Sequence, residues 1–124
     1  EGINNGAEAV MISHNIVSAI DENNPASLSI SIHNLLRNEL GFTGIIITDD
    51  LYMGAVSKIE NNTLKALIAG NDLIITTDYE KSFNEIKNAL LKGIISEDLI
   101  NNEITEDLII KKLIEIVEEG NINA

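Results

Sequence analysis

Two adjacent carboxylates, Asp49 and Asp50, are the side chains of this sequence best suited to chemistry. They directly follow the apolar run Ile45-Ile46-Ile47 and Thr48. A carboxylate at the end of a buried strand is costly unless it is used or paired. Such a group can act as a nucleophile or can hold a divalent cation. A structural interpretation stays open at this point, in which one aspartate caps the following turn and the other is solvated.

Short apolar runs predict the strands that would carry this pair. Strands are expected near residues 9 to 13, 44 to 49 and 72 to 77, because each run is too brief for a helix of ordinary length. Between them, helical spacing predicts helices over residues 62 to 69 and 79 to 91. Strands that alternate with helices in this way must run parallel, so an α/β fold is expected.

Two further helical segments are predicted from capping residues and apolar spacing. The first is capped by Ser29 and ended by Gly41, and its buried face is expected to contain Ile32, Leu35, Leu36 and Leu40. The second begins at Ser96, and its apolar stripe is formed by Ile100, Ile104, Leu108, Leu113 and Val117. The second segment gives the chain a helical C-terminal tail.

The carboxyl ends of the three predicted strands should meet on one face. His14, Asp49 and Thr77 stand at these ends, and parallel α/β folds place their chemistry there. Successive residues of a strand point to opposite faces. Asp49 and Asp50 therefore cannot both act on one bond, and a reaction that needs two such groups must recruit its second group elsewhere.

Composition excludes several classes of function. The 20 acidic and 8 basic residues give a formal charge of −12, which repels nucleic acids and anionic membrane surfaces. The sequence has no cysteine, so disulfides, thiolate metal sites and cysteine nucleophiles are absent. No apolar run approaches the roughly 20 residues of a membrane-spanning helix. These features leave the cellular compartment open.

The segment Leu35–Asp49 resembles the signature of the family 3 glycoside hydrolases. Two aliphatic residues, a base, a spacer and an acid lead through a four-residue gap to glycine, three aliphatics, threonine and aspartate. Four flanking stretches are similar, in the same order, to the bacterial β-N-acetylglucosaminidase (β-N-acetylhexosaminidase) branch of that family: residues 11–14, 24–29, 50–53 and 69–73. The resemblance extends over nearly the whole chain.

This resemblance implies a fold and a reaction. Residues 1–124 would be the C-terminal part of a (β/α)8 TIM barrel domain and would supply its strands 6 to 8. The parent enzyme would remove terminal, non-reducing β-linked N-acetylglucosamine by a retaining double displacement, without a metal or a cofactor. The resemblance places the nucleophile at Asp49 and substrate contacts at His14, Asp50 and Met53.

The resemblance also implies what the chain lacks. In this branch the acid/base looks like a histidine backed by an aspartate in a loop near strand 5, which is not in this sequence, so the chain alone is expected to be inactive. Tyr52 departs from the pattern, which usually has a small residue there, and this affects the fit of the sugar subsite. His33 lies between apolar helix positions and is expected to have a surface or packing role.

Two other interpretations compete with a glycosidase. One is a doubly wound phosphoacceptor or binding module, in which Asp49 and Asp50 hold Mg²⁺. The order of the acidic residues argues against it, because such modules place the acidic pair after their first strand. The other is a purely structural piece. Three strands cut from a barrel leave open edges, so self-association through these edges is expected.

Overall fold

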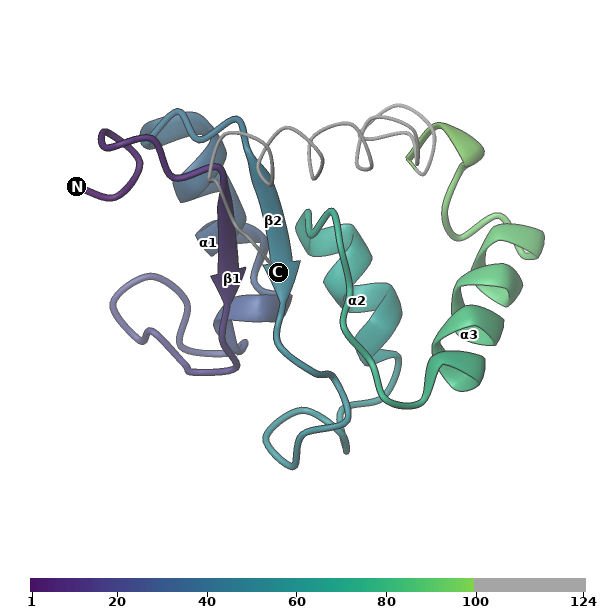
Figure 1. The fold of residues 1–124 in the computed structure, drawn as a ribbon. Coiled ribbons are helices and arrows are strands. Elements are labelled where there is room, and N and C mark those ends of the chain that lie inside the picture. The colour runs from purple at the N-terminus through teal and green to yellow at the C-terminus, as the bar shows by residue number, and fades with distance from the viewer. Residues whose placement is uncertain (100–124) are drawn as a thin grey trace, which may run out of the picture.

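The computed structural model describes residues 1–99, and Figure 1 shows their arrangement. The described elements are, in order, β1 (Ala9–Ile12), the 3₁₀ turn η1 (Ala26–Leu28), α1 (Ile30–Asn34), the π-helical turn η2 (Leu35–Glu39), β2 (Ile45–Thr48), α2 (Asn62–Ala69) and α3 (Tyr79–Leu91). The chain alternates strands with helices, as its sequence predicts.

The two strands form a parallel pair. Ala9 lies opposite Ile45, and Ile12 lies opposite Thr48. The ladder extends one residue past β2, because the Asp49 N–H donates to the Ile12 carbonyl at 3.1 Å. The predicted parallel arrangement of these strands is therefore confirmed, and Asp49 has its backbone fixed by β1.

The prediction of a regular third strand over residues 72 to 77 is wrong. This segment lies parallel beside β2, but it forms a single bridge, between Leu73 and Ile47. The next step of the ladder is diverted, because the Ile75 N–H donates to the Thr48 hydroxyl oxygen at 3.0 Å. The following donor is Leu51, whose N–H reaches the Ile75 carbonyl at 2.9 Å. A side-chain acceptor thus interrupts the regular pairing after one bridge.

The first helix begins as predicted but ends differently. The Ser29 hydroxyl caps α1 by accepting from the Ile32 N–H at 3.2 Å. The helix then widens into η2, where the Leu40 N–H donates to the Leu35 carbonyl at 2.9 Å. A wider turn moves the following side chains around the helix axis. Leu40, predicted on the buried face, is consequently 53% exposed.

The later helices have their predicted boundaries. Gly70 ends α2 with a φ of 115°, a conformation in which glycine carries little strain. Asp78 caps α3, and its carboxylate accepts from the Lys81 N–H at 3.2 Å. Ser96 caps the next segment through the Leu99 N–H at 3.3 Å, and the apolar stripe predicted from Ile100 onward lies outside the described residues. Within residues 1–99, no helix combines the length and apolar character needed to span a bilayer.

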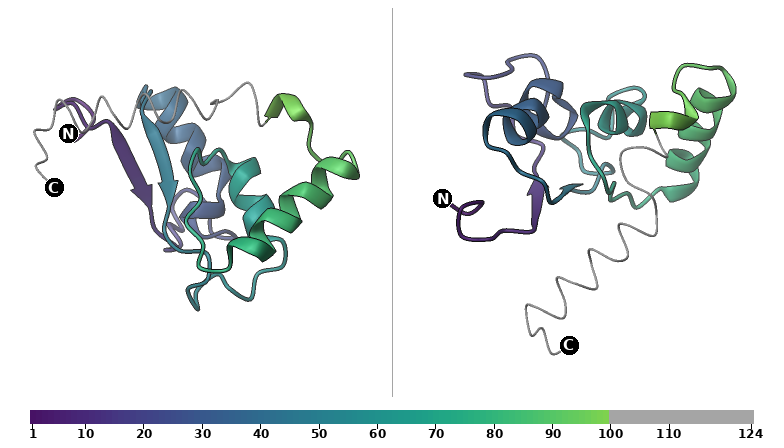
Figure 2. Two further views of the ribbon diagram at one scale, coloured as in Figure 1. Left: turned by 45° about the vertical axis from the view of Figure 1, so that its right-hand side comes forward. Right: turned by 90° about the horizontal axis from the view of Figure 1, so that it is seen from above.

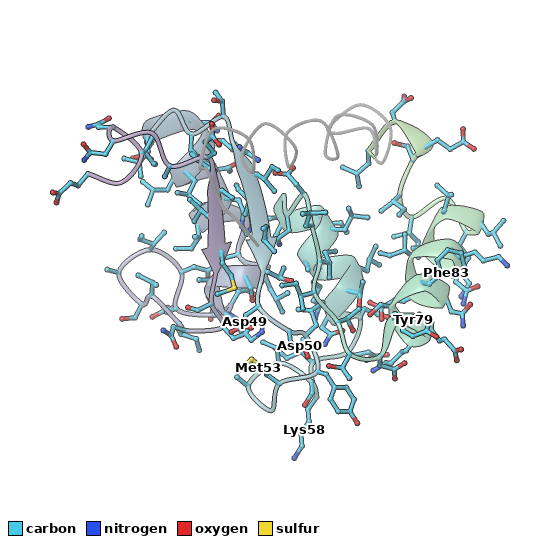
Figure 3. All side chains as sticks on the ribbon, viewed as in Figure 1. Asp49, Asp50, Met53, Lys58, Tyr79 and Phe83 are labelled. Carbon is cyan, nitrogen blue, oxygen red and sulfur yellow. The ribbon has the colours of Figure 1, made fainter. Side chains whose placement is uncertain are left out.

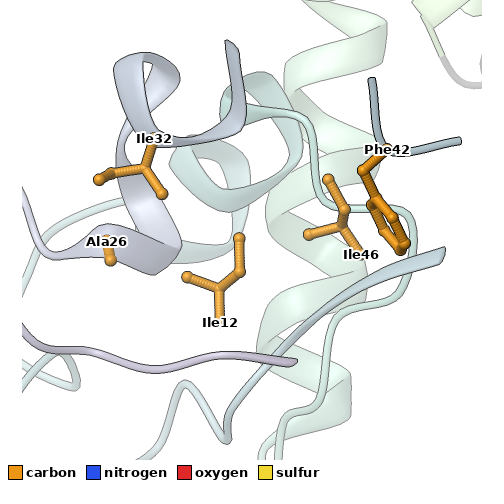
Figure 4. Close-up of a cluster of buried hydrophobic side chains, with 5 residues drawn as sticks. All are labelled: Ile12, Ala26, Ile32, Phe42 and Ile46. Atoms are coloured by element: carbon orange, nitrogen blue, oxygen red, sulfur yellow. The ribbon is translucent and has the colours of Figure 1, made fainter. Parts of the chain in front are cut away.

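The core lies between the sheet and the helices on one of its faces (Figure 2). One buried cluster, drawn in Figure 4, consists of Ile12, Ala26, Ile32, Phe42 and Ile46. A second cluster, beside α2, consists of Leu28, Leu51, Val56 and Ala66. His33 belongs to the same helix layer, is 2% exposed and donates from Nδ1 to the Ser29 carbonyl at 2.7 Å. Of the two roles expected for His33, packing is the one observed.

A buried ion pair joins η2 to the start of the 72–77 segment. The Arg37 guanidinium donates to the Asp72 carboxylate at 2.7 Å, and the Ile46 N–H donates to the same oxygen at 2.8 Å. Burial raises the pKa of Asp72, while the Ile46 amide and Arg37 act in the opposite direction. Arg37 also donates to the carbonyls of Phe42 and Gly44. The pair therefore holds the amino end of β2 against the helix layer.

Replacing Arg37 with methionine should cost about 2 kcal/mol of unfolding free energy at pH 7, because a buried carboxylate loses its charged partner. A raised pKa means that folding penalises the ionised Asp72, so stability falls as pH rises from the ordinary carboxyl range through the folded pKa. Without Arg37 that pKa rises further, and the loss should shrink near pH 4. Urea unfolding at both pH values tests this, with exposed Lys58→Met as the control. Equal losses at both pH values would contradict it.

Candidate active site

Asp49 lies at the carboxyl end of β2, next to the end of β1 (Figure 3). The side chain before it, Thr48, is fully buried toward the helix layer. Because side chains alternate along an extended chain, Asp49 points to the opposite side, away from the helices. It is partly exposed there. This position suits a group that acts on a ligand placed beyond the strand ends.

The Asp49 carboxylate is only partly engaged. Its Oδ1 accepts from the Asp50 N–H at 2.8 Å, which closes the turn after β2. No side chain within residues 1–99 donates to Asp49, and Oδ2 has no hydrogen bond there. One carboxylate oxygen therefore remains able to attack or to accept a hydrogen bond from a ligand, while the other keeps the side chain oriented.

Asp50 is engaged quite differently. Its carboxylate accepts from the Tyr52 N–H at 2.9 Å, from the Thr77 N–H at 3.0 Å and from the Thr77 hydroxyl. These bonds, that of the Thr77 hydroxyl first, lower the pKa of Asp50. Asp50 thus clamps the turn after β2 to the end of the 72–77 segment. The predicted contact between Asp50 and a substrate stays a prediction.

His14 is brought to the same turn. It is 9% exposed, and both ring nitrogens have partners in the chain. Nδ1 lies 2.7 Å from the Ser27 hydroxyl oxygen, and Nε2 lies 2.9 Å from the Asp50 carbonyl oxygen. A substrate contact by His14, as predicted from the sequence, stays a prediction, and a ligand would have to replace one of these two hydrogen bonds.

The loop after Asp50 is open to solvent. Met53 is 47% exposed and Tyr52 is 62% exposed. The Met53 N–H donates to the Asp50 carbonyl at 3.1 Å, which holds the loop beside Asp49. Met53 and Lys58 lie on this loop at the same end of the molecule as Asp49 (Figure 3). Tyr52 projects outward, so its size disturbs no packing within the described part of the chain.

Comparison with known proteins decides between the competing interpretations. Residues 1–123 match the family model described as the Glycosyl hydrolase family 3 N terminal domain. The chain belongs to glycoside hydrolase family 3. The resemblance of its signature segment is thereby confirmed, and the chain is placed among the glycosidases and not among the phosphoacceptor modules.

Relatives of this family 3 chain carry matching names. A β-hexosaminidase of Nitrosomonas eutropha is 35% identical over 91 residues, which are 71% of this chain and 26% of that protein. An uncharacterised secreted glycosyl hydrolase of Arthroderma benhamiae is 33% identical over 103 residues, 76% of this chain and 29% of that protein. The chain spans about a quarter of the length of such relatives.

Solved structures give the same assignment. A family 3 β-N-acetylglucosaminidase from a Paenibacillus species matches 98% of this chain and 24% of its own, with a TM-score of 0.73 and 31% identity. The β-N-acetylglucosaminidase of Thermotoga maritima matches 90% of this chain and 26% of its own, with a TM-score of 0.76 and 27% identity. The family 3 chain therefore has an α/β fold with parallel strands, similar to the barrel domains of its family.

Sequence reasoning missed three hydroxyl groups of the site. Ser27 contacts His14, Thr77 contacts Asp50, and Thr48 accepts from the backbone of the 72–77 segment. Thr77 stands at a predicted strand end, but nothing in its spacing links it to Asp50. Ser27 lies in a three-residue turn that has no periodicity. Its only signal is a polar residue after Pro25 inside one of the stretches similar to the family.

A surface hollow of this family 3 chain lies away from Asp49. It has a volume of about 390 Å³ and is lined by Asp21, Asn24, Leu28, Ile30, Ser31, Lys65 and Ile68. These residues come from the loop after β1, from η1 and α1, and from α2, so the hollow opens on the helix layer. It includes none of the predicted site residues and is separate from the strand ends that carry Asp49.

Proposed function

We propose that this chain is the C-terminal part of a barrel domain, contributing strands 6 to 8, in an enzyme that hydrolyses terminal β-linked N-acetylglucosamine residues. The observation that carries the proposal is the place of Asp49: it ends the family signature, lies at the carboxyl end of a parallel strand and keeps one carboxylate oxygen unengaged. The β-hexosaminidase and β-N-acetylglucosaminidase names of its relatives support the substrate class.

Asp49 is the proposed nucleophile. Its carboxylate oxygen forms a bond to the anomeric carbon as the glycosidic C–O bond breaks, and the leaving oxygen takes a proton from a general acid. Water then attacks the glycosyl ester and restores the carboxylate, so the anomeric configuration is retained. Neither step calls for a metal or a cofactor.

Asp50 is not suited to be the acid. A retaining glycosidase needs its two groups about 5 to 5.5 Å apart across the scissile bond, whereas the Asp50 carboxylate is turned toward Thr77 and held there. The acid/base is therefore assigned to residues outside this chain. Met53, half exposed on the loop beside Asp49, is the proposed apolar contact for the sugar.

For the isolated 124-residue chain we propose two properties. It has no glycosidase activity, because it supplies a nucleophile without the acid/base. It also self-associates: among residues 1–99, β1 pairs only with β2, and the face turned away from the helices exposes Met11 at 61% and Ile75 at 45%. Open edges beside apolar faces favour pairing with another chain.

Covalent labelling tests the proposal most directly. A fluorinated N-acetylglucosaminide that traps glycosyl esters should add one sugar to a peptide containing Ile47-Thr48-Asp49-Asp50 of the full-length protein. The same protein should hydrolyse an aryl β-N-acetylglucosaminide and initially release the β-anomer. Label on a different peptide would refute Asp49, and turnover by the isolated chain would refute the need for an outside acid/base.

A further inference from the structure

We propose that His14 is a positioning residue, which fixes the turn after β2 and thereby aims the Asp49 carboxylate. The inference rests on the proposed function and deepens it. Its basis is the pair of contacts from one nearly buried ring: Nδ1 to the Ser27 hydroxyl at 2.7 Å and Nε2 to the Asp50 carbonyl at 2.9 Å. The ring thus bridges the end of β1 and the end of β2.

The identity of the partners fixes the tautomer of His14. A carbonyl oxygen only accepts hydrogen bonds, so Nε2 must carry the proton that it donates to Asp50. In the neutral ring Nδ1 is then an acceptor, and the Ser27 hydroxyl donates to it. Ser27 is itself fully buried and fixed, because its N–H donates to the Ser13 carbonyl and its carbonyl accepts from the Asn71 amide. The ring is held in one orientation.

The contacts of His14 belong to a chain of hydrogen bonds that joins all three strand ends. His14 follows β1 and holds the carbonyl of Asp50, which follows β2. The carboxylate of Asp50 then holds Thr77, at the end of the parallel 72–77 segment. The turn that carries Asp49 is thereby held between its two neighbours in the sheet.

Asp49 receives its orientation through this turn. Its N–H is bonded to Ile12 of β1, and its Oδ1 accepts from the N–H of Asp50. The carbonyl of Asp50 is the one that His14 holds, so releasing it frees the residue whose amide orients Asp49. A displacement of about 1 Å at a reacting group can lower a rate by about 10²-fold.

Two matched variants of the full-length enzyme separate the two contacts of the ring. His14→Gln can still place an amide N–H near the position of Nε2, so it keeps the bond to Asp50. His14→Asn is one methylene shorter and can accept from Ser27 but cannot reach Asp50. With an aryl β-N-acetylglucosaminide, the asparagine variant should lose about 10²-fold in kcat with KM nearly unchanged. The glutamine variant should retain most of kcat, and both should keep the pH profile of the wild type.

A raised KM with unchanged kcat in both variants would identify His14 as a substrate contact and overturn the proposal. Loss of one limb of the pH profile would overturn it as well, since it would make the ring a proton donor or acceptor.

Measurements without substrate separate this proposal from the proposed function. Hydrogen exchange of the Asp50 amide should be faster in His14→Asn than in His14→Gln, and equal exchange would overturn the positioning role even if the enzyme proved inactive on sugars. Nitrogen-15 spectra of the wild-type ring should show the proton on Nε2. A ring protonated on Nδ1 alone would also overturn the proposal, and this result needs no variant.

Discussion

Replacing Asp49 with asparagine is expected to lower kcat of the full-length enzyme by about 10⁴-fold or more. The amide keeps the size of the side chain and can still accept from the Asp50 N–H, but it cannot form the glycosyl ester. Substrate affinity should stay nearly unchanged, because the change removes an interaction of the reaction pathway and not one of ground-state binding. Steady-state kinetics on an aryl β-N-acetylglucosaminide give the result.

Asp50→Asn is the matched control for the nucleophile. The two carboxylates are adjacent in the sequence, but Asp50 is occupied by Thr77 and Tyr52, so its loss should loosen the turn and reduce kcat far less. Azide adds a second test, because a small anion can replace the missing carboxylate in Asp49→Gly and should yield the α-glycosyl azide. Equal losses in the Asp49 and Asp50 variants, without azide rescue, would contradict the assignment.

Gly44→Ala is expected to lower the free energy of unfolding by about 3 kcal/mol or more. A Cβ at this position would lie 2.1 Å from the Glu8 carbonyl oxygen and 2.6 Å from Cζ of Phe42. The phenyl ring is part of the core, and the Glu8 carbonyl accepts from the Ile45 N–H at 2.9 Å. Neither neighbour can retreat without loosening the start of the sheet.

Gly54→Ala is the control for the glycine prediction. It lies on the loop after β2, where an added Cβ would meet nothing within 4 Å. Its unfolding free energy should change by less than about 0.5 kcal/mol. Urea unfolding of both variants measures the difference, and a similar cost at the two positions would show that steric contact is not the cause.

Local signals predicted most of the fold. β2 was predictable because a continuous run of β-branched residues is bounded by Gly44 and an acidic pair, and α3 because Asp78 caps it. The failures have tertiary or local geometric causes. The 72–77 run has strand composition, but a hydroxyl of its neighbour captures one of its amides. The widened turn η2 carries Leu40 out of the core, and helical spacing cannot anticipate such a change of period.

The site was predictable only in part for a related reason. Asp49 stands out because a lone acidic pair ends an apolar strand. The partners of His14 lie 13 and 36 positions away in the sequence, and no periodicity connects them. Sequence reasoning could bring His14 and Asp49 to the same face, since both follow strands. Which atoms of that face are already bonded to one another is settled only by the folded chain.

Thr48 gives a physical meaning to one letter of the family signature. Three aliphatics precede it, and a valine would continue the run with the same shape and volume. A valine cannot accept a hydrogen bond, however, and the N–H of Ile75, which the Thr48 oxygen receives at 3.0 Å, would be left without it. The hydroxyl is a surrogate for a backbone carbonyl, lent to the neighbouring strand. The requirement for serine or threonine before the aspartate is thus a rule about joining strands, written one residue ahead of the chemistry.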